Sequence, residues 1–151
     1  MSPTIEKVPL AATKVQDEHS AGQATLNIAV VFTSIESTLS ALRKAASLAS
    51  GLHACIMLIV PQVVPYPLPL TSPPVSPEFT TRQFRVLTEQ SPVETTTRIY
   101  LCRDRLDTLL QVLEPHSLVV VGGRRRWWPT ADELLARQLR RVGHKVVFAE
   151  A

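Results

Sequence analysis

The chain has 151 residues, enough for one domain, and 45% of them are apolar, so it can bury a core without a disulfide or metal staple. Its net charge of +3 is too mild to indicate nucleic acid, and we expect no nucleic-acid partner. The two cysteines, Cys55 and Cys102, stand in no Cys-x-x-Cys or Cys/His pattern, which argues against a disulfide framework and a zinc site.

Residues 1–25 precede the first apolar segment. They are polar and non-periodic, which predicts a flexible N-terminal tail. They lack the charged-then-apolar order of a secretory signal, and no stretch of the chain approaches the roughly 20 apolar residues of a transmembrane helix. We therefore expect a cytoplasmic protein with no membrane span, whose folded domain covers residues 26–151.

Strand and helix patterns alternate through the first half of this domain. The apolar, β-branched run 26–32 predicts a buried strand, and the run 54–60 predicts a second one. Between them, Thr33 followed three residues later by Glu36 is a capping-box pattern that predicts the start of a helix. Residues 61–77 hold seven of the twelve prolines and therefore predict a Pro-rich loop.

The alternation continues through the second half. After a short helix, the mixed composition of residues 93–102 predicts a third strand nearer a sheet edge. Asp104 is the expected cap of a third helix, and the all-apolar end of the run 117–121 predicts a central fourth strand. Thr130 opens the last helix, and residues 144–151 form a fifth strand. The order predicts a single doubly wound α/β domain, a parallel sheet with helices on both faces.

Two segments carry a resemblance to a known family. The sequence ALRKAASLASGLHACIMLIV at 41–60 and the ending SLVVVGG…LLARQLRRVGHKVVFA resemble the universal stress protein family, and the likeness covers roughly residues 26–150. That family belongs to a wider group of adenine-nucleotide-binding α/β folds. The resemblance implies five parallel strands in the order 3-2-1-4-5, a stress-response role, and often a homodimer built on the last strand.

The family's glycine motif is degenerate in this chain. Nucleotide-binding members carry Gly, two residues, Gly, nine residues, then Gly and Ser or Thr. Gly122 matches the first glycine, but Arg125 stands at the second, and Leu135 with Ala136 at the third pair. Glycine lets backbone N–H groups approach a phosphate, and bulkier residues do not. These departures predict that the chain has no cofactor and does not bind ATP in the usual way. The alternative is that it still binds an adenine nucleotide, by other contacts.

In open parallel sheets, ligands bind beyond the carboxyl ends of the strands, where the strand order reverses. This rule predicts a candidate ligand-binding or partner-binding site after the first and fourth predicted strands. Its residues are Thr33, Ser34, Gly122, Gly123, Arg124, Arg125, Arg126, Trp127 and Trp128.

The loop after the fourth predicted strand admits three interpretations. Its arginines could hold an anion with help from the N–H groups around Ala131, while a tryptophan stacks on a base. Tryptophan and arginine are also the residues that most often anchor protein interfaces. Alternatively, the tryptophans cover the sheet end and the arginines are solvated or pair with carboxylates such as Asp104 and Glu133. Three further arginines near the end of the last helix, at 137, 140 and 141, are interpreted as helix-dipole partners.

The last predicted strand is strongly apolar at Val146, Val147 and Phe148. An uncovered edge of that kind invites pairing, so we expect a two-fold homodimer through this strand. The alternative is that the N-terminal tail or a loop covers it.

The sequence offers no catalytic constellation: no nucleophile with a base, no carboxylate pair and no set of metal ligands. We therefore expect a non-enzymatic regulatory or protein-interaction module that contacts its partner through residues 122–128. The alternative is a nucleotide or anion sensor that holds phosphate through the same loop.

Overall fold

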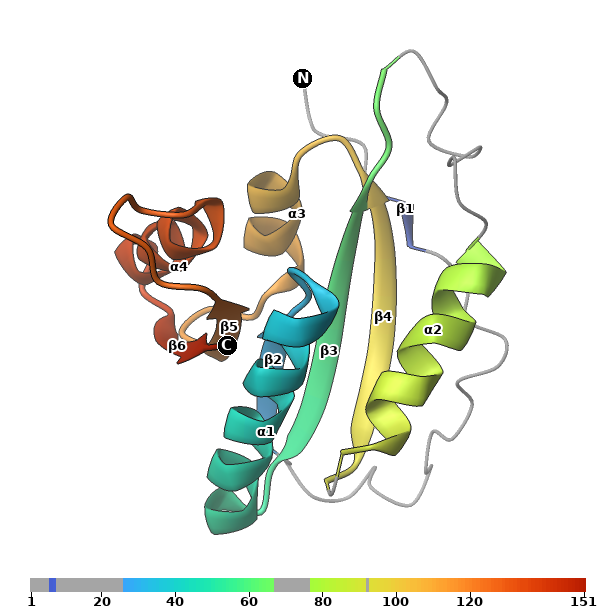
Figure 1. Ribbon diagram of the computed structural model, residues 1–151, viewed down its shortest axis with the longest axis vertical. Helices are drawn as coiled ribbons and strands as arrows, with labels where there is room; N and C mark the ends of the chain where they lie inside the picture. The colour runs from blue at the N-terminus through green and yellow to red at the C-terminus, as the bar shows by residue number, and fades with distance from the viewer. Residues whose placement is uncertain (1–5, 8–25, 67–76, 92) are drawn as a thin grey trace.

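The computed structural model describes residues 6–7, 26–66, 77–91 and 93–151 (Figure 1). The elements in chain order are β1 (Glu6–Lys7), β2 (Asn27–Val31), α1 (Ile35–Leu52), β3 (Cys55–Val63), α2 (Pro77–Glu89), β4 (Thr95–Cys102), α3 (Arg105–Val112), β5 (Leu118–Gly123), α4 (Ala131–Arg141) and β6 (Lys145–Glu150).

The sheet confirms the predicted fold class and strand order. Its order is β1-β4-β3-β2-β5-β6, and all pairings among β2 to β6 are parallel. Counted along the chain, the five parallel strands lie in the order 3-2-1-4-5. Val30 in β2 pairs with Leu58 on one side and Val120 on the other, so the strand order reverses between β2 and β5. The carboxyl ends of these two strands therefore mark the topological switch point.

A two-residue strand extends the sheet beyond its parallel part. In β1, Glu6 and Lys7 pair antiparallel with Leu101 and Tyr100 of β4. The prediction of a flexible tail over residues 1–25 did not include this strand, and the rest of that segment lies outside the described residues. β4, expected near an edge, is the last parallel strand on this side. At the other edge of the sheet lies β6.

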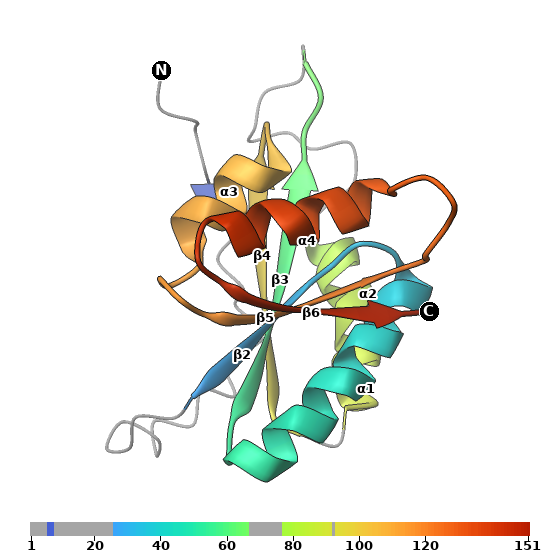
Figure 2. The same cartoon turned by 90° about the vertical axis from the view of Figure 1, so that its left-hand side faces the viewer.

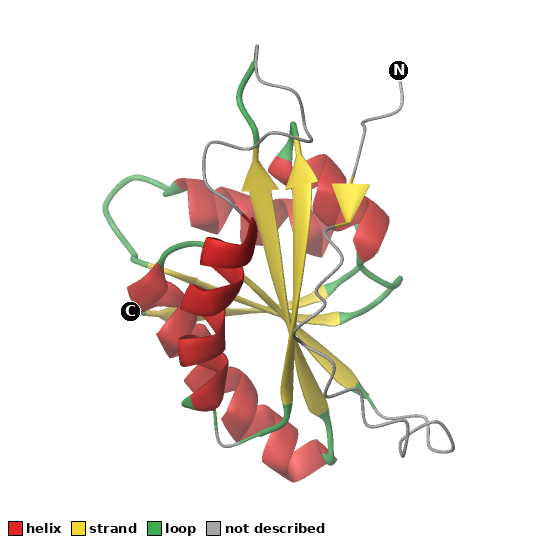
Figure 3. Ribbon diagram, turned by 90° about the vertical axis from the view of Figure 1, so that its right-hand side faces the viewer, coloured by secondary structure: helices red, strands yellow, loops and turns green. Residues whose placement is uncertain are grey.

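Apolar side chains alternate between the two faces of the sheet and form two cores. On one face, α1 and α2 cover Ile28, Val30 and Ile56, and four alanines let α1 approach the strands closely. On the other face, α3 and α4 cover Val119 and Val121. Figure 3 shows the helices on both sides of the twisted sheet. The central strands are buried on both faces, which explains why their sequences are almost continuously apolar.

The predicted loop begins later than expected, because β3 continues through Pro61 to Val63. Pro61 lies opposite Tyr100 of β4, while β2 has already ended at Val31, opposite Ile59. The N–H of Phe32 donates to Ile59 O, so the backbone groups of Ile59 face β2. Backbone groups alternate in direction along a strand, so those of Pro61, two residues later, face the same side. Its missing N–H therefore faces a side where no strand needs it. Residues 67–76 of the predicted loop lie outside the described residues.

Candidate functional site

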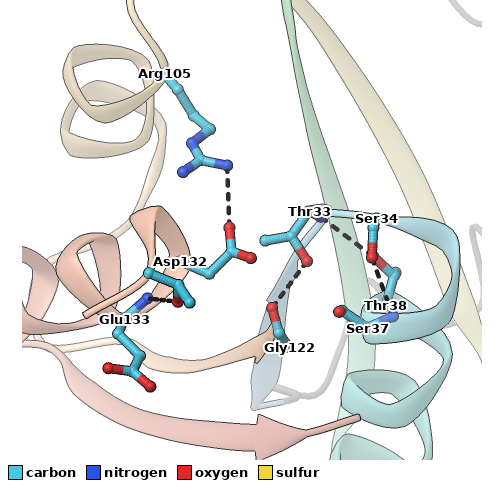
Figure 4. A network of polar contacts seen from close by, with 9 residues as sticks. Thr33, Ser34, Ser37, Thr38, Arg105, Gly122, Asp132 and Glu133 are labelled. Atoms are coloured by element: carbon cyan, nitrogen blue, oxygen red, sulfur yellow. Dashed lines mark hydrogen bonds and ion pairs between the residues drawn. The ribbon is translucent and has the colours of Figure 1, made fainter. Parts of the chain in front are cut away.

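The first two candidate residues, Thr33 and Ser34, are used inside the fold. Ser34, in extended conformation, is the N-cap of α1, and its Oγ accepts from the Ser37 N–H at 3.3 Å. The prediction that Thr33 caps this helix is wrong, because its hydroxyl instead donates to Gly122 O of β5 at 2.8 Å (Figure 4). Adjacent hydroxyl residues compete for the cap, and a contact 89 residues away in the chain decides between them.

Gly122 and Gly123 allow close packing around the end of β5. A Cβ on Gly122 would lie 1.9 Å from the backbone oxygen of Ser37, because the first turn of α1 rests on this glycine. A Cβ on Gly123 would lie 2.7 Å from the ring of Phe148. The two glycines therefore bring α1 and β6 against β5, and this packing accounts for them without a phosphate.

An ion pair crosses the nearby start of α4. Arg105, at the first residue of α3, lies 3.5 Å from the carboxylate of Asp132 (Figure 4). Thr130 is the N-cap of α4 and accepts from the Glu133 N–H, which confirms the predicted cap. Two acidic side chains thus occupy the first turn of α4, where the helix dipole already favours them over an incoming anion.

The three consecutive arginines after β5 point to different places. Arg124 forms an ion pair with Glu36 in the first turn of α1, and both side chains are more than half exposed. The Arg125 guanidinium lies 5.8 Å from the centroid of the Phe148 ring on β6. Arg126 lines a groove together with Arg125, between the loop, α4 and β6. The sequence anticipated the arginine cluster but not this division of its members.

We call this concavity the arginine groove. It has a volume of about 340 Å³. Its lining residues are Arg125, Arg126, Glu133, Ala136, Arg137, Arg140 and Phe148. Figure 2 shows why they meet: α4 lies along β6 in the opposite direction, and the loop that enters α4 passes the end of β6.

Sequence reasoning missed Arg137 and Arg140 as members of a site. Both follow Glu133 at helical spacing, so they share one face of α4. That spacing was visible in the sequence, but only the placement of β6 beside this face makes it one wall of a groove. Arg140 is held there by two hydrogen bonds, of 3.1 and 3.3 Å, that its guanidinium donates to Val146 O.

Trp127 and Trp128 stand in solvent. The two residues are 100% and 81% exposed, which makes them the most exposed of the large apolar residues among those described. The interpretation in which the tryptophans cover the sheet end is therefore wrong. Their loop, residues 124–130, carries no regular structure, and the residues on both sides of the pair are also exposed.

The strand predicted to form a dimer edge is β6. Val146 and Phe148 pack toward α4, and Val147 packs toward α1, so all three side chains are partly buried within the domain. Lys145 N–H donates to Ser117 O of β5, and Ala151 N–H donates to Gly123 O. The alternation of a parallel ladder then turns the backbone groups of Val146 and Phe148 to the outer edge. Arg140 occupies one of them, the Val146 carbonyl.

The thiols lie apart from this region and are not activated. Burial, with the nearby carboxylate of Glu94, raises the pKa of Cys55, and burial raises the pKa of Cys102. Both cysteines are free. A raised pKa favours the thiol over the nucleophilic thiolate.

Within the described part of the chain, no three or more His, Cys, Asp or Glu side chains gather where they could hold a metal ion. None of its helices is both long enough and apolar enough to cross a membrane.

The fold places the protein among the doubly wound parallel α/β domains. No protein-family model matches the chain, and no curated protein is significantly similar to it in sequence. Its resemblance to universal stress proteins therefore stays a prediction.

Proposed function

We propose that this chain is a non-enzymatic, cytoplasmic interaction module of the universal stress protein type, which docks on a protein partner through residues 124–128. The observation that carries the proposal is the exposure of Trp127 and Trp128, which are adjacent in the chain and both in solvent. Exposed aromatic surface of this kind marks interaction sites, and a Trp buried in a partner's pocket contributes strongly to affinity.

The packing at the switch point supports a role other than ATP binding of the usual kind. A phosphate held by glycine backbone needs open space beside the strand end and free N–H groups. Gly122 instead lies under the first turn of α1, and the N–H of Glu133 is bonded to Thr130. Asp132 adds negative charge at the helix start where a phosphate would bind. A role in the stress response is carried by the family resemblance alone.

A homodimer through β6 is the second part of the proposal. The outward backbone groups of Phe148 can pair with a second copy, and two-fold pairing would cover the edge. Arg140 must then release the Val146 carbonyl or remain at the rim of the interface. This requirement makes the dimer sensitive to one side chain.

The alternative function is an anion sensor, and one observation favours it. Arg125 and Arg126 both turn into the arginine groove, where two arginines of α4 join them. Such a sensor would hold its anion beside β6 rather than at the switch point between β2 and β5.

The docking proposal is tested by quantitative capture from an extract of the cells that produce the protein. Immobilised wild-type chain is compared with a Trp127→Ala/Trp128→Ala variant and with a Leu52→Ala control, an exposed apolar residue at the far end of α1. We expect one or a few proteins to be retained by the wild type and the control and lost from the double variant. Equal retention by all three chains would overturn the proposal, provided that their unfolding temperatures agree.

A further inference from the structure

Four arginines line one groove at the β6 edge, and Glu133 supplies the one carboxylate among the described residues that line it. The arginines come from two segments: Arg125 and Arg126 from the loop, Arg137 and Arg140 from α4. In a chain with a net charge of only +3, this is a local concentration of positive charge. We propose that the arginine groove binds an acidic segment of the partner protein, one that carries at least two carboxylates and an apolar side chain.

Two of the four arginines are already held in place. Arg140 donates both its Nε and an Nη to Val146 O, and Arg125 lies over the face of the Phe148 ring. Side chains that are fixed before binding lose less conformational freedom when a ligand arrives. Planar guanidinium groups also match carboxylates with paired hydrogen bonds, which gives the site a chemical preference.

The other two arginines supply exposed charge. Arg126 and Arg137 are exposed, and within the described residues neither has an ion pair with a carboxylate. By contrast Arg124, the first arginine of the loop, is paired with Glu36 and is not part of the groove. Of the three loop arginines, the two that are not paired with a carboxylate in the described residues therefore lie beside β6.

An acidic segment fits better than a small anion because of the groove's surroundings. Phe148, which is partly exposed, gives the groove an apolar part, which a phosphate cannot use but a side chain of a peptide can. The exposed Trp127 and Trp128 follow Arg126 directly in the chain and extend the contact surface beyond the groove. Recognition of acidic motifs by clustered arginines is a recurring way to bind peptides. The inference rests on the proposed docking function and specifies its partner chemistry.

The test uses purified full-length chain and an end-blocked, fluorescein-labelled peptide, Gly-Glu-Glu-Leu-Glu-Glu-Phe-Gly. Its control is the same peptide with glutamine in place of each glutamate. We expect fluorescence anisotropy at low ionic strength to show the glutamate peptide binding at least about tenfold more tightly than its control. The difference should shrink as salt rises, because screening shortens the range of exposed charges.

Variants locate the binding. Arg126→Gln/Arg137→Gln should weaken peptide binding by about tenfold or more, since charge-assisted hydrogen bonds are lost. Arg82→Gln/Arg141→Gln removes the same charge outside the groove and should change the affinity less than about twofold. Glu133→Gln, which removes the repelling carboxylate, should strengthen binding by about threefold. All substituted residues except Glu133 are exposed, so the variants should keep the wild-type unfolding temperature.

Three kinds of outcome would overturn the inference. One is a lack of specificity, seen either as equal binding of the two peptides or as equal loss in the two double-arginine variants. Another is tight binding of inorganic phosphate or ATP in the groove without binding of the glutamate peptide, which would make it a small-anion site. The third is a change of the monomer–dimer equilibrium in Arg126→Gln/Arg137→Gln without peptide binding, which would make the groove a contact between copies.

The failure of this inference is distinguishable from failure of the docking function. If the Trp127→Ala/Trp128→Ala variant loses its captured protein while the glutamate peptide does not bind, only the partner chemistry is wrong. If the peptide binds in the groove while the tryptophan substitutions leave capture unaffected, the inference about the arginine groove is supported and the proposed docking through the tryptophans is wrong.

Discussion

Gly122 is the point where α1 and β5 touch through their backbones, and it offers a sharp test at the scale of one residue. Gly122→Ala places a methyl group 1.9 Å from Ser37 O, a backbone atom in a capped helix turn that cannot move freely. We expect the free energy of unfolding to fall by about 3 kcal/mol, the cost of a severe overpacking. Urea denaturation followed by circular dichroism measures it.

Gly51 is the matched control for this substitution. It lies in the last turns of α1, and a Cβ there would meet nothing within 4 Å. Gly51→Ala should stabilise the protein by about 0.5–1 kcal/mol, because alanine loses less conformational entropy in a helix. A Gly122→Ala variant as stable as the wild type would show that α1 does not rest on β5 as described.

His144 makes stability depend on pH. Burial, helped by the neighbouring His116, lowers the pKa of His144 below its ordinary value of 6.5, and its Nδ1 accepts the Ser117 N–H at 3.2 Å. The unfolded chain therefore binds a proton at this residue at a higher pH than the folded chain does. Stability should be full above about pH 6.5 and should decrease as the pH falls from there through the lowered pKa of the folded state.

A substitution isolates this contribution. His144→Asn keeps a side-chain acceptor but cannot be protonated in this range, so its stability should fall less between pH 7 and pH 5 than that of the wild type. The exposed His53→Asn, at a left-handed position that asparagine tolerates, should keep the wild-type slope. Parallel pH profiles for wild type and His144→Asn, from urea denaturation at each pH, would count against the role of His144.

At the scale of elements, Arg140 lies against the outer edge of β6. Its guanidinium covers the Val146 carbonyl, one of the backbone groups that a second copy would need. If β6 pairs with a second copy, the wild type must first release this exposed, charge-assisted contact, at a cost of about 1 kcal/mol. Arg140→Ala removes that cost, so we expect dimerisation to strengthen by about fivefold. Sedimentation equilibrium measures it, with Arg141→Ala as the control. An unchanged or weaker association in Arg140→Ala would contradict pairing through this edge.

Elements whose signals are local were predictable from the sequence. Asp104 and Thr130 were expected as caps, and each accepts the N–H three residues later, because a cap depends only on its own turn. The parallel sheet followed from the alternation of apolar runs and helices. Thr33 and Pro61 could not be predicted in this way, because both depend on distant elements. The Thr33 hydroxyl donates to the Gly122 carbonyl, and Pro61 can lie in β3 because β2 ends before it.

The candidate site was predictable only in part, because its geometry depends on contacts between distant elements. The arginine and tryptophan cluster was visible in the sequence, but whether the tryptophans were exposed or covered the sheet end was left open. The packing of Gly122 under α1 could not be read from the motif, since a glycine that binds phosphate and a glycine that admits a helix look the same in sequence. Likewise Arg137 becomes a site residue only once β6 lies beside α4.

At the scale of the whole molecule, the question is whether the protein binds a nucleotide through its base and phosphates or binds phosphate charge alone. The strand-end region is closed by packing and carries Asp132, whereas the four arginines of the arginine groove lie beside β6. We therefore expect any stabilisation by ATP to come from its phosphates, acting on the arginine groove. Thermal unfolding with ATP, AMP and inorganic tripolyphosphate at equal millimolar concentrations separates the two cases.

The expected result is that tripolyphosphate raises the unfolding temperature at least as much as ATP does, and that AMP has no measurable effect. A ligand at about 100 times its dissociation constant adds roughly 2.7 kcal/mol of stability, so a genuine nucleotide site would be evident. Arg125→Ala should reduce the ATP and tripolyphosphate effects equally, because it removes charge rather than a base contact. If ATP and AMP both stabilised the protein more than tripolyphosphate did, and Arg125→Ala abolished the difference, the chain would be a nucleotide sensor in which arginine replaces the glycine backbone.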